Sequence, residues 1–277
     1  MEKEIRKELA EMAAASVHEA WCMGELKGFH QRYLAAVEAE SKQKSEEDEF
    51  MSYVLGVDSR GALDKACFKG DKKRNEVSLS DKAYGQNWIW AKMSTLEGFL
   101  SLIADGYIKV KRFTRRDLTQ EEIQAAGKNY NPQTKEENIL RPFKRLSAAS
   151  KEENMSAAIG AVKIYEEYLR RGYTVEQLRS PELRDEIGTL IHADWMQRNK
   201  INKGNEHLFV PYAELDDWTK QQDLDVFYAM LEVVEKNPER YAVERVDGLR
   251  PLNAKGVESE ILSIRDNDDY WLRNIKL

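Results

Sequence analysis

The strongest constraint on the fold comes from residues 183–231, where three successive elements follow a helical pattern. In the first, Ile191 precedes His192 and Trp195, which share a face because residues three apart lie on the same side of a helix. In the second, a short apolar run ends at Pro211, a residue that is common at the first position of a helix. An amphipathic stretch follows, with apolar residues at Leu224, Phe227, Tyr228, Leu231 and Val234. The region therefore predicts a compact helical domain.

Composition supports a helical fold and excludes several classes of protein. Of 277 residues, 42% are hydrophobic and 33% charged, with only 6 prolines, which predicts a globular, mainly α protein with short β segments. The net charge of -6 argues against general nucleic-acid binding, which depends on neutralising phosphates. Two cysteines give no disulfide framework, the N-terminal residues lack the layout of a signal peptide, and no apolar run approaches the ~18 residues of a membrane span. We expect a cytoplasmic protein without a membrane partner.

Apolar spacing and turn residues give a coarse map of the chain. Helical spacing without proline predicts one long helix over residues 4–41. The apolar block 88–103 predicts a buried helix with Trp88 and Trp90 in the core, and the alternation over 107–111 predicts a short strand.

Helix-start signals and a polar stretch define the expected domains. Ser180, Pro181 and Glu182 form a strong helix start, and the polar stretch that ends at Ser150 gives the main boundary. In the tail, residues 261–264 could form a strand and Trp271 is expected to pack. The expected division is an N-terminal helical region over 1–150, a repeat-type domain over 151–246 and a C-terminal tail over 247–277.

A weaker copy of the apolar-His-x-x-Trp spacing lies near the N-terminus, at Val17, His18 and Trp21. It looks like the start of a degenerate first repeat within residues 1–150. Residues 75–103 are a candidate for its second half, because they parallel residues 205–218. The sequence thus leaves open a pseudo-tandem pair.

The region 183–231 resembles the repeat domain first named from ryanodine receptors, which also occurs as small stand-alone proteins in bacteria and phages. Ile191, His192 and Trp195 carry the resemblance together with residues 207–212, Glu214, Leu215 and the closing helix. The resemblance covers about a quarter of the chain. The loop at 196–206 is shorter than in the family and lacks its Trp-x-Tyr-Gly turn, and Leu208 replaces a proline.

The resemblance implies recognition of a ligand rather than catalysis. In receptor tandem repeats the two tryptophans sandwich an adenine-type ring, and prokaryotic members are proposed sensors of nucleotide-derived ligands. By residue match the tryptophans here are Trp21 and Trp195, and stacking on an indole is worth ~1–3 kcal/mol per base. The expected protein binds a nucleotide-like molecule and could be phage-encoded, acting on host nucleotide signalling. The expected ligand-binding residues are Trp21, Trp195, His18, His192 and Tyr212, with Lys200 and Lys203 as phosphate contacts.

Several alternatives remain open at this point. The tryptophans could be core residues and the histidines structural, each donating a ring N–H to a neighbour. The chain could then be a structural or protein-interaction module, or a homo-oligomer, with no small-molecule ligand. Contact with nucleic acid could come only from a basic cluster, which comprises Lys109, Lys111, Arg112, Arg115 and Arg116.

Enzyme and metal signatures are missing from the sequence. There is no Gly-x-Ser-x-Gly elbow, no Walker motif and no Rossmann glycine pattern, so no catalytic residues and no cofactor are predicted. His18 and Cys22 stand four apart, as two zinc ligands could, but no second pair with such spacing exists and no metal site is expected.

Overall fold

The computed structural model describes residues 1–41, 60–66, 75–201 and 205–249. Contacts divide the chain into two compact units. We call residues 1–21 together with those from 142 onwards the helical unit, and residues 22–141 the mixed unit. This division differs from the expected boundary at residue 150, because residues 1–21 pack with the C-terminal half. The strand expected at 261–264, and Trp271, lie outside the described residues.

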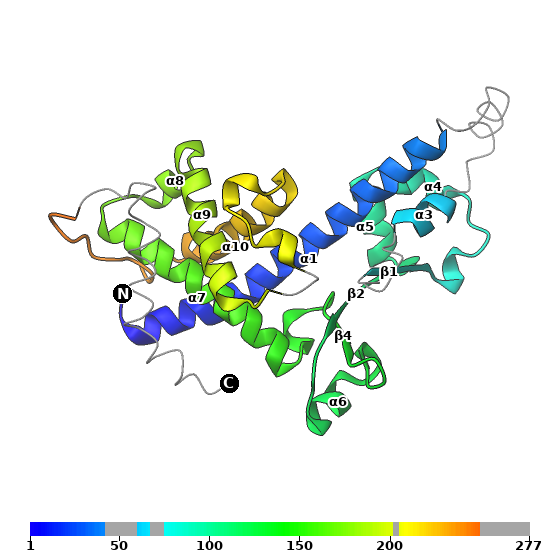
Figure 1. The fold of residues 1–277 in the computed structure, drawn as a ribbon, viewed down its shortest axis with the longest axis horizontal. Coiled ribbons are helices and arrows are strands. Elements are labelled where there is room, and N and C mark those ends of the chain that lie inside the picture. The colour runs from blue at the N-terminus through cyan, green and yellow to red at the C-terminus, as the bar shows by residue number, and fades with distance from the viewer. Residues whose placement is uncertain (42–59, 67–74, 202–204, 250–277) are drawn as a thin grey trace. The chain divides into compact units, whose positions relative to one another are not determined.

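The helical unit contains the first part of α1 (Lys3–Ser41) and the helices α7 (Ala148–Arg170), α8 (Val175–Leu178), α9 (Pro181–Arg198) and α10 (Asp217–Lys236). Three short 3-10 turns accompany them: η3 (Phe143–Arg145), η4 (Glu206–Leu208) and η5 (Tyr212–Glu214). Helices α7, α9 and α10 pack against one another (Figure 1). Their apolar faces share a core with the first part of α1. This core includes Leu9, Val17, Val162, Leu190, Phe227 and Leu231. Among the described helices, none has the length and apolar character needed to cross a bilayer.

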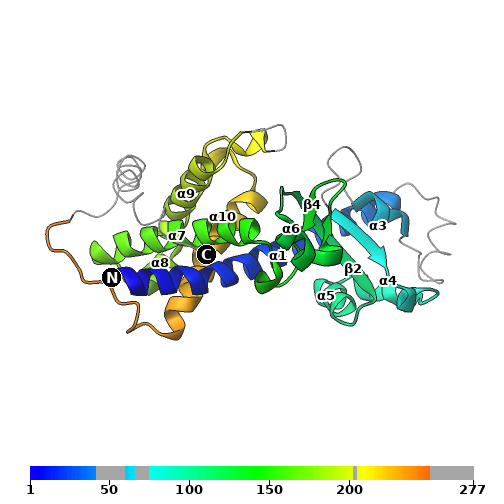
Figure 2. The same cartoon turned by 90° about the horizontal axis from the view of Figure 1, so that it is seen from below.

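The mixed unit combines helices with a small antiparallel sheet (Figure 2). Its helices are the second part of α1, α3 (Arg60–Ala66), α4 (Trp88–Met93), α5 (Leu96–Ala104) and α6 (Gln120–Ala126), with short turns η1 (Asp81–Ala83) and η2 (Gly127–Asn129). The strands β1 (Asn75–Leu79), β2 (Ile108–Arg115), β3 (Tyr130–Asn131) and β4 (Glu136–Asn138) lie in the order β1-β2-β4-β3. The mainly helical fold with short strands agrees with the sequence-based prediction.

Two tryptophans of α4 differ in their surroundings. Trp90 belongs to the core of the mixed unit, as predicted, together with Phe29, Phe99 and Ile108. Trp88 is 41% exposed and meets Tyr107 edge-on, with ring centroids 5.1 Å apart. The prediction that both tryptophans are core residues is therefore correct only for Trp90.

The same turn occurs twice in the helical unit. Pro142 has φ/ψ of -52°/137° and Pro211 has -53°/143°. Four residues later Leu146 has -72°/156° and Leu215 has -67°/152°. In both copies the next residue caps a helix: Ser147 accepts from the backbone N–H of Ser150, and Asp216 from that of Thr219. The pattern Pro-aromatic-x-x-Leu-Ser/Asp thus produces one backbone path in both places.

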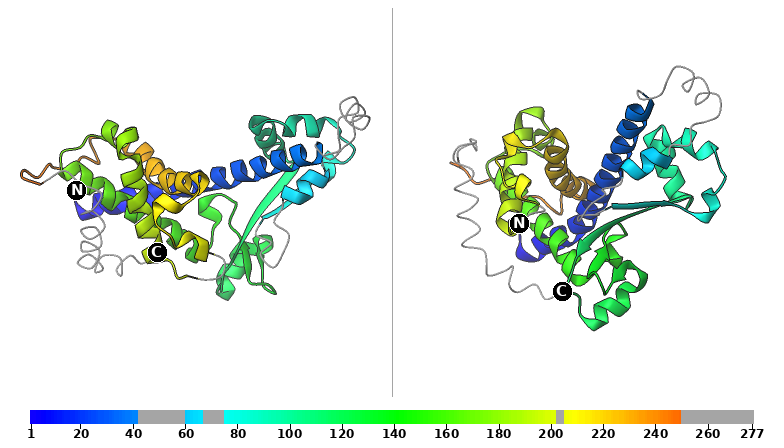
Figure 3. Two further views of the ribbon diagram at one scale, coloured as in Figure 1. Left: turned by 45° about the horizontal axis from the view of Figure 1, so that its top comes forward. Right: turned by 45° about the vertical axis from the view of Figure 1, so that its right-hand side comes forward.

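The His-x-x-Trp spacing lies on α1 in one copy and on α9 in the other. In both views of Figure 3, α1 is the long blue helix. Residues 196–210 connect Trp195 to Pro211, whereas the whole mixed unit, residues 22–141, stands between Trp21 and Pro142. The segment with the same turn and a capped helix after it is therefore at residues 142–170. The expected counterpart at 75–103 is instead part of the mixed unit, where it forms β1, α4 and α5.

Candidate functional site

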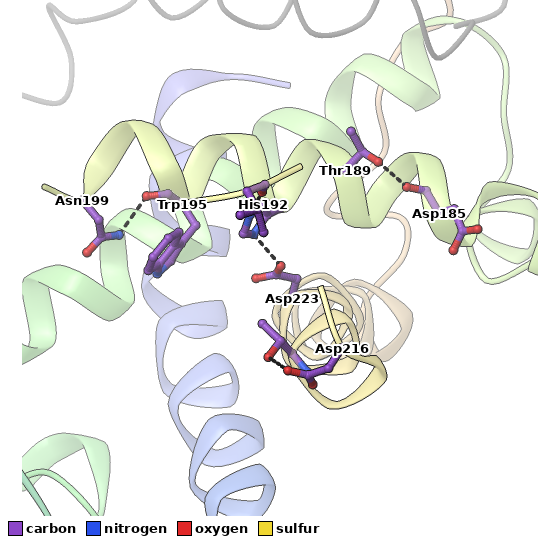
Figure 4. A network of polar contacts seen from close by, with 9 residues as sticks. Asp185, Thr189, His192, Trp195, Asn199, Asp216 and Asp223 are labelled. Atoms are coloured by element: carbon purple, nitrogen blue, oxygen red, sulfur yellow. Dashed lines mark hydrogen bonds and ion pairs between the residues drawn. The ribbon is translucent and has the colours of Figure 1, made fainter. Parts of the chain in front are cut away.

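His192 on α9 is the centre of the polar contacts between α9 and α10 (Figure 4). Its side chain is 2% exposed. The Nδ1 atom lies 2.9 Å from Oδ2 of Asp223 on α10, and Nε2 lies 2.9 Å from the carbonyl oxygen of Val210. Both ring nitrogens are therefore used within the protein, so His192 acts on any ligand only through the neighbours that it positions. This geometry favours the structural interpretation of this histidine.

The contacts of His192 decide where its protons lie. A carbonyl oxygen only accepts, so Nε2 donates to Val210, and a single further proton is shared between Nδ1 and Asp223. Burial lowers the pKa of His192, but the hydrogen bond and the charge of Asp223 outweigh it, and that pKa is raised overall. Burial raises the pKa of Asp223 despite the opposing effects of His192 and of Arg198. Both shifts favour retention of the proton that the pair shares.

Trp195 lies one turn beyond His192 and is neither sealed in the core nor fully exposed. Its ring stacks on the imidazole with centroids 5.7 Å apart and an interplanar angle of 12°. Phe209 packs against it at 5.2 Å and 53°. The indole is half-buried, so the buried histidine fixes its orientation while part of it stays accessible.

The first copy repeats this arrangement of rings. His18 is 2% exposed and stacks on Trp21 with centroids 5.8 Å apart and an interplanar angle of 25°. Phe143, from the turn that corresponds to η5, lies 6.1 Å from His18. Trp21 is half-buried, as Trp195 is. Each copy therefore supports one partly accessible indole on a buried imidazole.

Tyr212, one of the expected ligand-binding residues, is almost completely buried. It is 5% exposed, and its hydroxyl has no hydrogen-bond partner among the described residues. Burial raises its pKa to about 12, with added contributions from the carboxylates of Asp185 and Asp223. The ring lies directly against Gly188 of α9, where an added Cβ would stand 2.2 Å from Cζ.

Of the two lysines expected to contact phosphate, only Lys200 is among the described residues. Lys200 is exposed and follows Asn199, the C-cap of α9, where the helix dipole disfavours an anion. Lys203 lies outside the described residues.

The described residues contain no group of three or more His, Cys, Asp or Glu side chains arranged to hold a metal ion. Cys67, the second cysteine, lies outside them. A cavity of about 50 Å³ in the mixed unit is lined by residues such as Leu79, Ile89 and Trp90 and includes no predicted ligand residue. It has room for a few water molecules.

Comparison of the chain with protein families, with curated proteins and with solved structures found no match. The resemblance to ryanodine-receptor repeats therefore remains an expectation based on the residues quoted above.

We expect the stability of the helical unit to depend on the proton shared by His192 and Asp223. The pKa of His192 in the folded protein is raised above its ordinary value of 6.5. The stabilisation of the folded state by the protonated pair is therefore fully present below about pH 6.5. It is lost as the pH rises through the pKa of His192 in the folded protein. Asp223→Asn removes the titrating carboxylate, and the amide can donate to Nδ1 of a neutral imidazole. The difference in unfolding free energy between the wild type and this variant should shrink with rising pH. A constant difference in urea unfolding from about pH 5 to about pH 9 would contradict the shared proton.

Proposed function

We propose that the helical unit is a tandem pair of ryanodine-receptor-type repeats that binds a nucleotide or nucleotide-derived molecule through Trp21 and Trp195, without catalysis. The observation that carries the proposal is the twofold occurrence of a half-buried indole stacked on a buried imidazole. Because the resemblance includes phage members, the proposal extends to a phage-encoded protein that acts on host nucleotide signalling.

The physical argument rests on preorganisation. An indole held by a buried ring loses little conformational freedom when a base stacks on it, so more of the stacking free energy appears as affinity. Each histidine thus serves binding by positioning a tryptophan, and His192 is itself fixed by Asp223 and Val210. Two stacking contacts of ~1–3 kcal/mol each, with a few polar contacts, are compatible with micromolar binding, about -8 kcal/mol.

Calorimetric titration with adenosine and adenosine diphosphate tests this proposal. Trp21→Leu and Trp195→Leu should each weaken binding by about 5- to 100-fold, because each removes one stacking surface. Trp88→Leu is the matched control, since Trp88 is also partly exposed but lies in the mixed unit. It should leave the affinity unchanged. No binding by the wild type, or equal losses in all three variants, would refute the proposal.

A protein-interaction module is the second candidate. In the helical unit, Met12 on α1 is an apolar side chain that is 50% exposed. A partner or a second copy that covers this part of α1 would give a stable oligomer at low concentration. Native mass spectrometry of protein purified from cells separates the candidates, because a retained small molecule supports the first and an oligomer without ligand supports the second.

A further inference from the structure

The hydroxyl of Tyr212 is a polar group that the protein buries without satisfying. No other described residue accepts from it or donates to it, and its oxygen has almost no accessible surface. A buried hydroxyl without a partner costs free energy, because it has lost its hydrogen bonds to water. Such a group calls for a specific explanation.

The first copy of the turn shows that packing does not need this hydroxyl. Phe143 occupies the position of Tyr212 and follows the same backbone path. The facing position in the helix changes as well, since Ala14 on α1 corresponds to Gly188 on α9. A Cβ at Gly188 would lie 2.3 Å from the Tyr212 hydroxyl, so the glycine is what admits the hydroxyl. The second copy thus combines an unpaired hydroxyl with a helical glycine, and both are unfavourable for stability.

Charges around the hydroxyl restrict what it can bind. Asp185 and Asp223 raise the pKa of Tyr212, and Arg184 opposes them. The ammonium of Lys220 lies over the ring, 5.9 Å from its centroid, and donates to the carbonyl of Ala213. With a pKa of about 12 the hydroxyl is neutral at physiological pH, and the nearby carboxylates act on it more strongly than Arg184 does. A neutral hydroxyl or amino group suits this environment better than a phosphate.

The hydroxyl belongs to the same cluster of rings as the indole of the second copy. The Tyr212 ring lies 6.4 Å from His192, on which Trp195 stacks. Gly188 and Trp195 are seven residues apart on α9, about 10 Å along the helix axis. A base with its attached sugar can bridge such a span.

We propose that the Tyr212 hydroxyl forms its hydrogen bond with a neutral hydroxyl or amino group on the sugar or base of the bound nucleotide. This inference rests on the proposed function and adds that the nucleoside part, rather than the phosphates, is recognised at the second copy. The hydroxyl lies against the backbone of α9 at Gly188 and has almost no accessible surface, so the proposal requires the η5 turn to move away from α9 when the ligand binds.

The test is Tyr212→Phe, with thermal unfolding of the free protein and titration with adenosine and with adenosine diphosphate. The variant should be at least as stable as the wild type without ligand, because it removes an unpaired hydroxyl. It should bind both ligands about 5- to 10-fold more weakly, as expected for one lost hydrogen bond. Tyr84→Phe is the matched control, because Tyr84 is 84% exposed and lies in the mixed unit. It should change neither measurement.

The other outcomes contradict either the proposed function or the proposed hydrogen bond of Tyr212. If the wild type binds neither ligand, the proposed function fails. If the wild type binds and Tyr212→Phe binds equally well, the function stands and the inference fails. A less stable Tyr212→Phe protein without ligand would mean that the hydroxyl already has an internal partner such as a water molecule. A loss confined to the diphosphate would overturn the assignment to the nucleoside.

Discussion

Gly188→Ala should destabilise the helical unit by about 1–3 kcal/mol, as is usual when a group is forced into a filled core. In an open helix the same change stabilises, by about 1 kcal/mol, because alanine is the better helix former. Here the added methyl group would stand 2.2 Å from Cζ of Tyr212, so α9 or η5 must shift. Urea unfolding monitored by circular dichroism measures the effect.

A double-mutant cycle identifies the source of that loss. If the overlap with Tyr212 is responsible, Gly188→Ala should be neutral or stabilising in a Tyr212→Ala background. The same loss in both backgrounds would show that the cost arises elsewhere, and would weaken the argument that glycine admits this ring.

Asp223→Ala should cost about 3 kcal/mol, because it leaves the buried Nδ1 of His192 without its partner. Asp223→Asn should cost clearly less, since an amide can still bond to a neutral imidazole. Asn154 holds the corresponding position on α7, where its amide donates to the carbonyl oxygen of Ser150. Denaturant unfolding at about pH 6 compares the two variants. Equal losses would show that charge rather than hydrogen bonding dominates.

The sequence predicted those elements whose signals are local. Pro181 opens α9 directly after Ser180, at the expected helix start. The strand predicted over 107–111 is longer in the structure and extends to Arg115, because β4 pairs with Phe113–Arg115. Such pairing depends on a segment that no local pattern identifies.

The two stacked ring pairs were predictable from the sequence, but their polar partners were not. The His-x-x-Trp spacing predicted that each histidine and tryptophan share a helix face. Pro142 with Phe143 carried the signal of the recurring turn, which the comparison with residues 75–103 missed. Asp223 could not be selected as the partner of His192 among 49 acidic residues, since 31 positions separate them. The contact between Tyr212 and Gly188 depends on the packing of α9 against η5, which the sequence does not reveal.

In the sequence, the mixed unit stands between the two parts of the helical unit, so the helical unit can fold only after the mixed unit has been synthesised. On a ribosome that adds about 5–20 residues per second, residues 22–141 delay the partner of the N-terminal segment by about 6–24 s. Leu9 and Val17 therefore stay exposed to water during synthesis until α7 leaves the ribosome. During that time the nascent chain can bind chaperones or aggregate through these apolar residues.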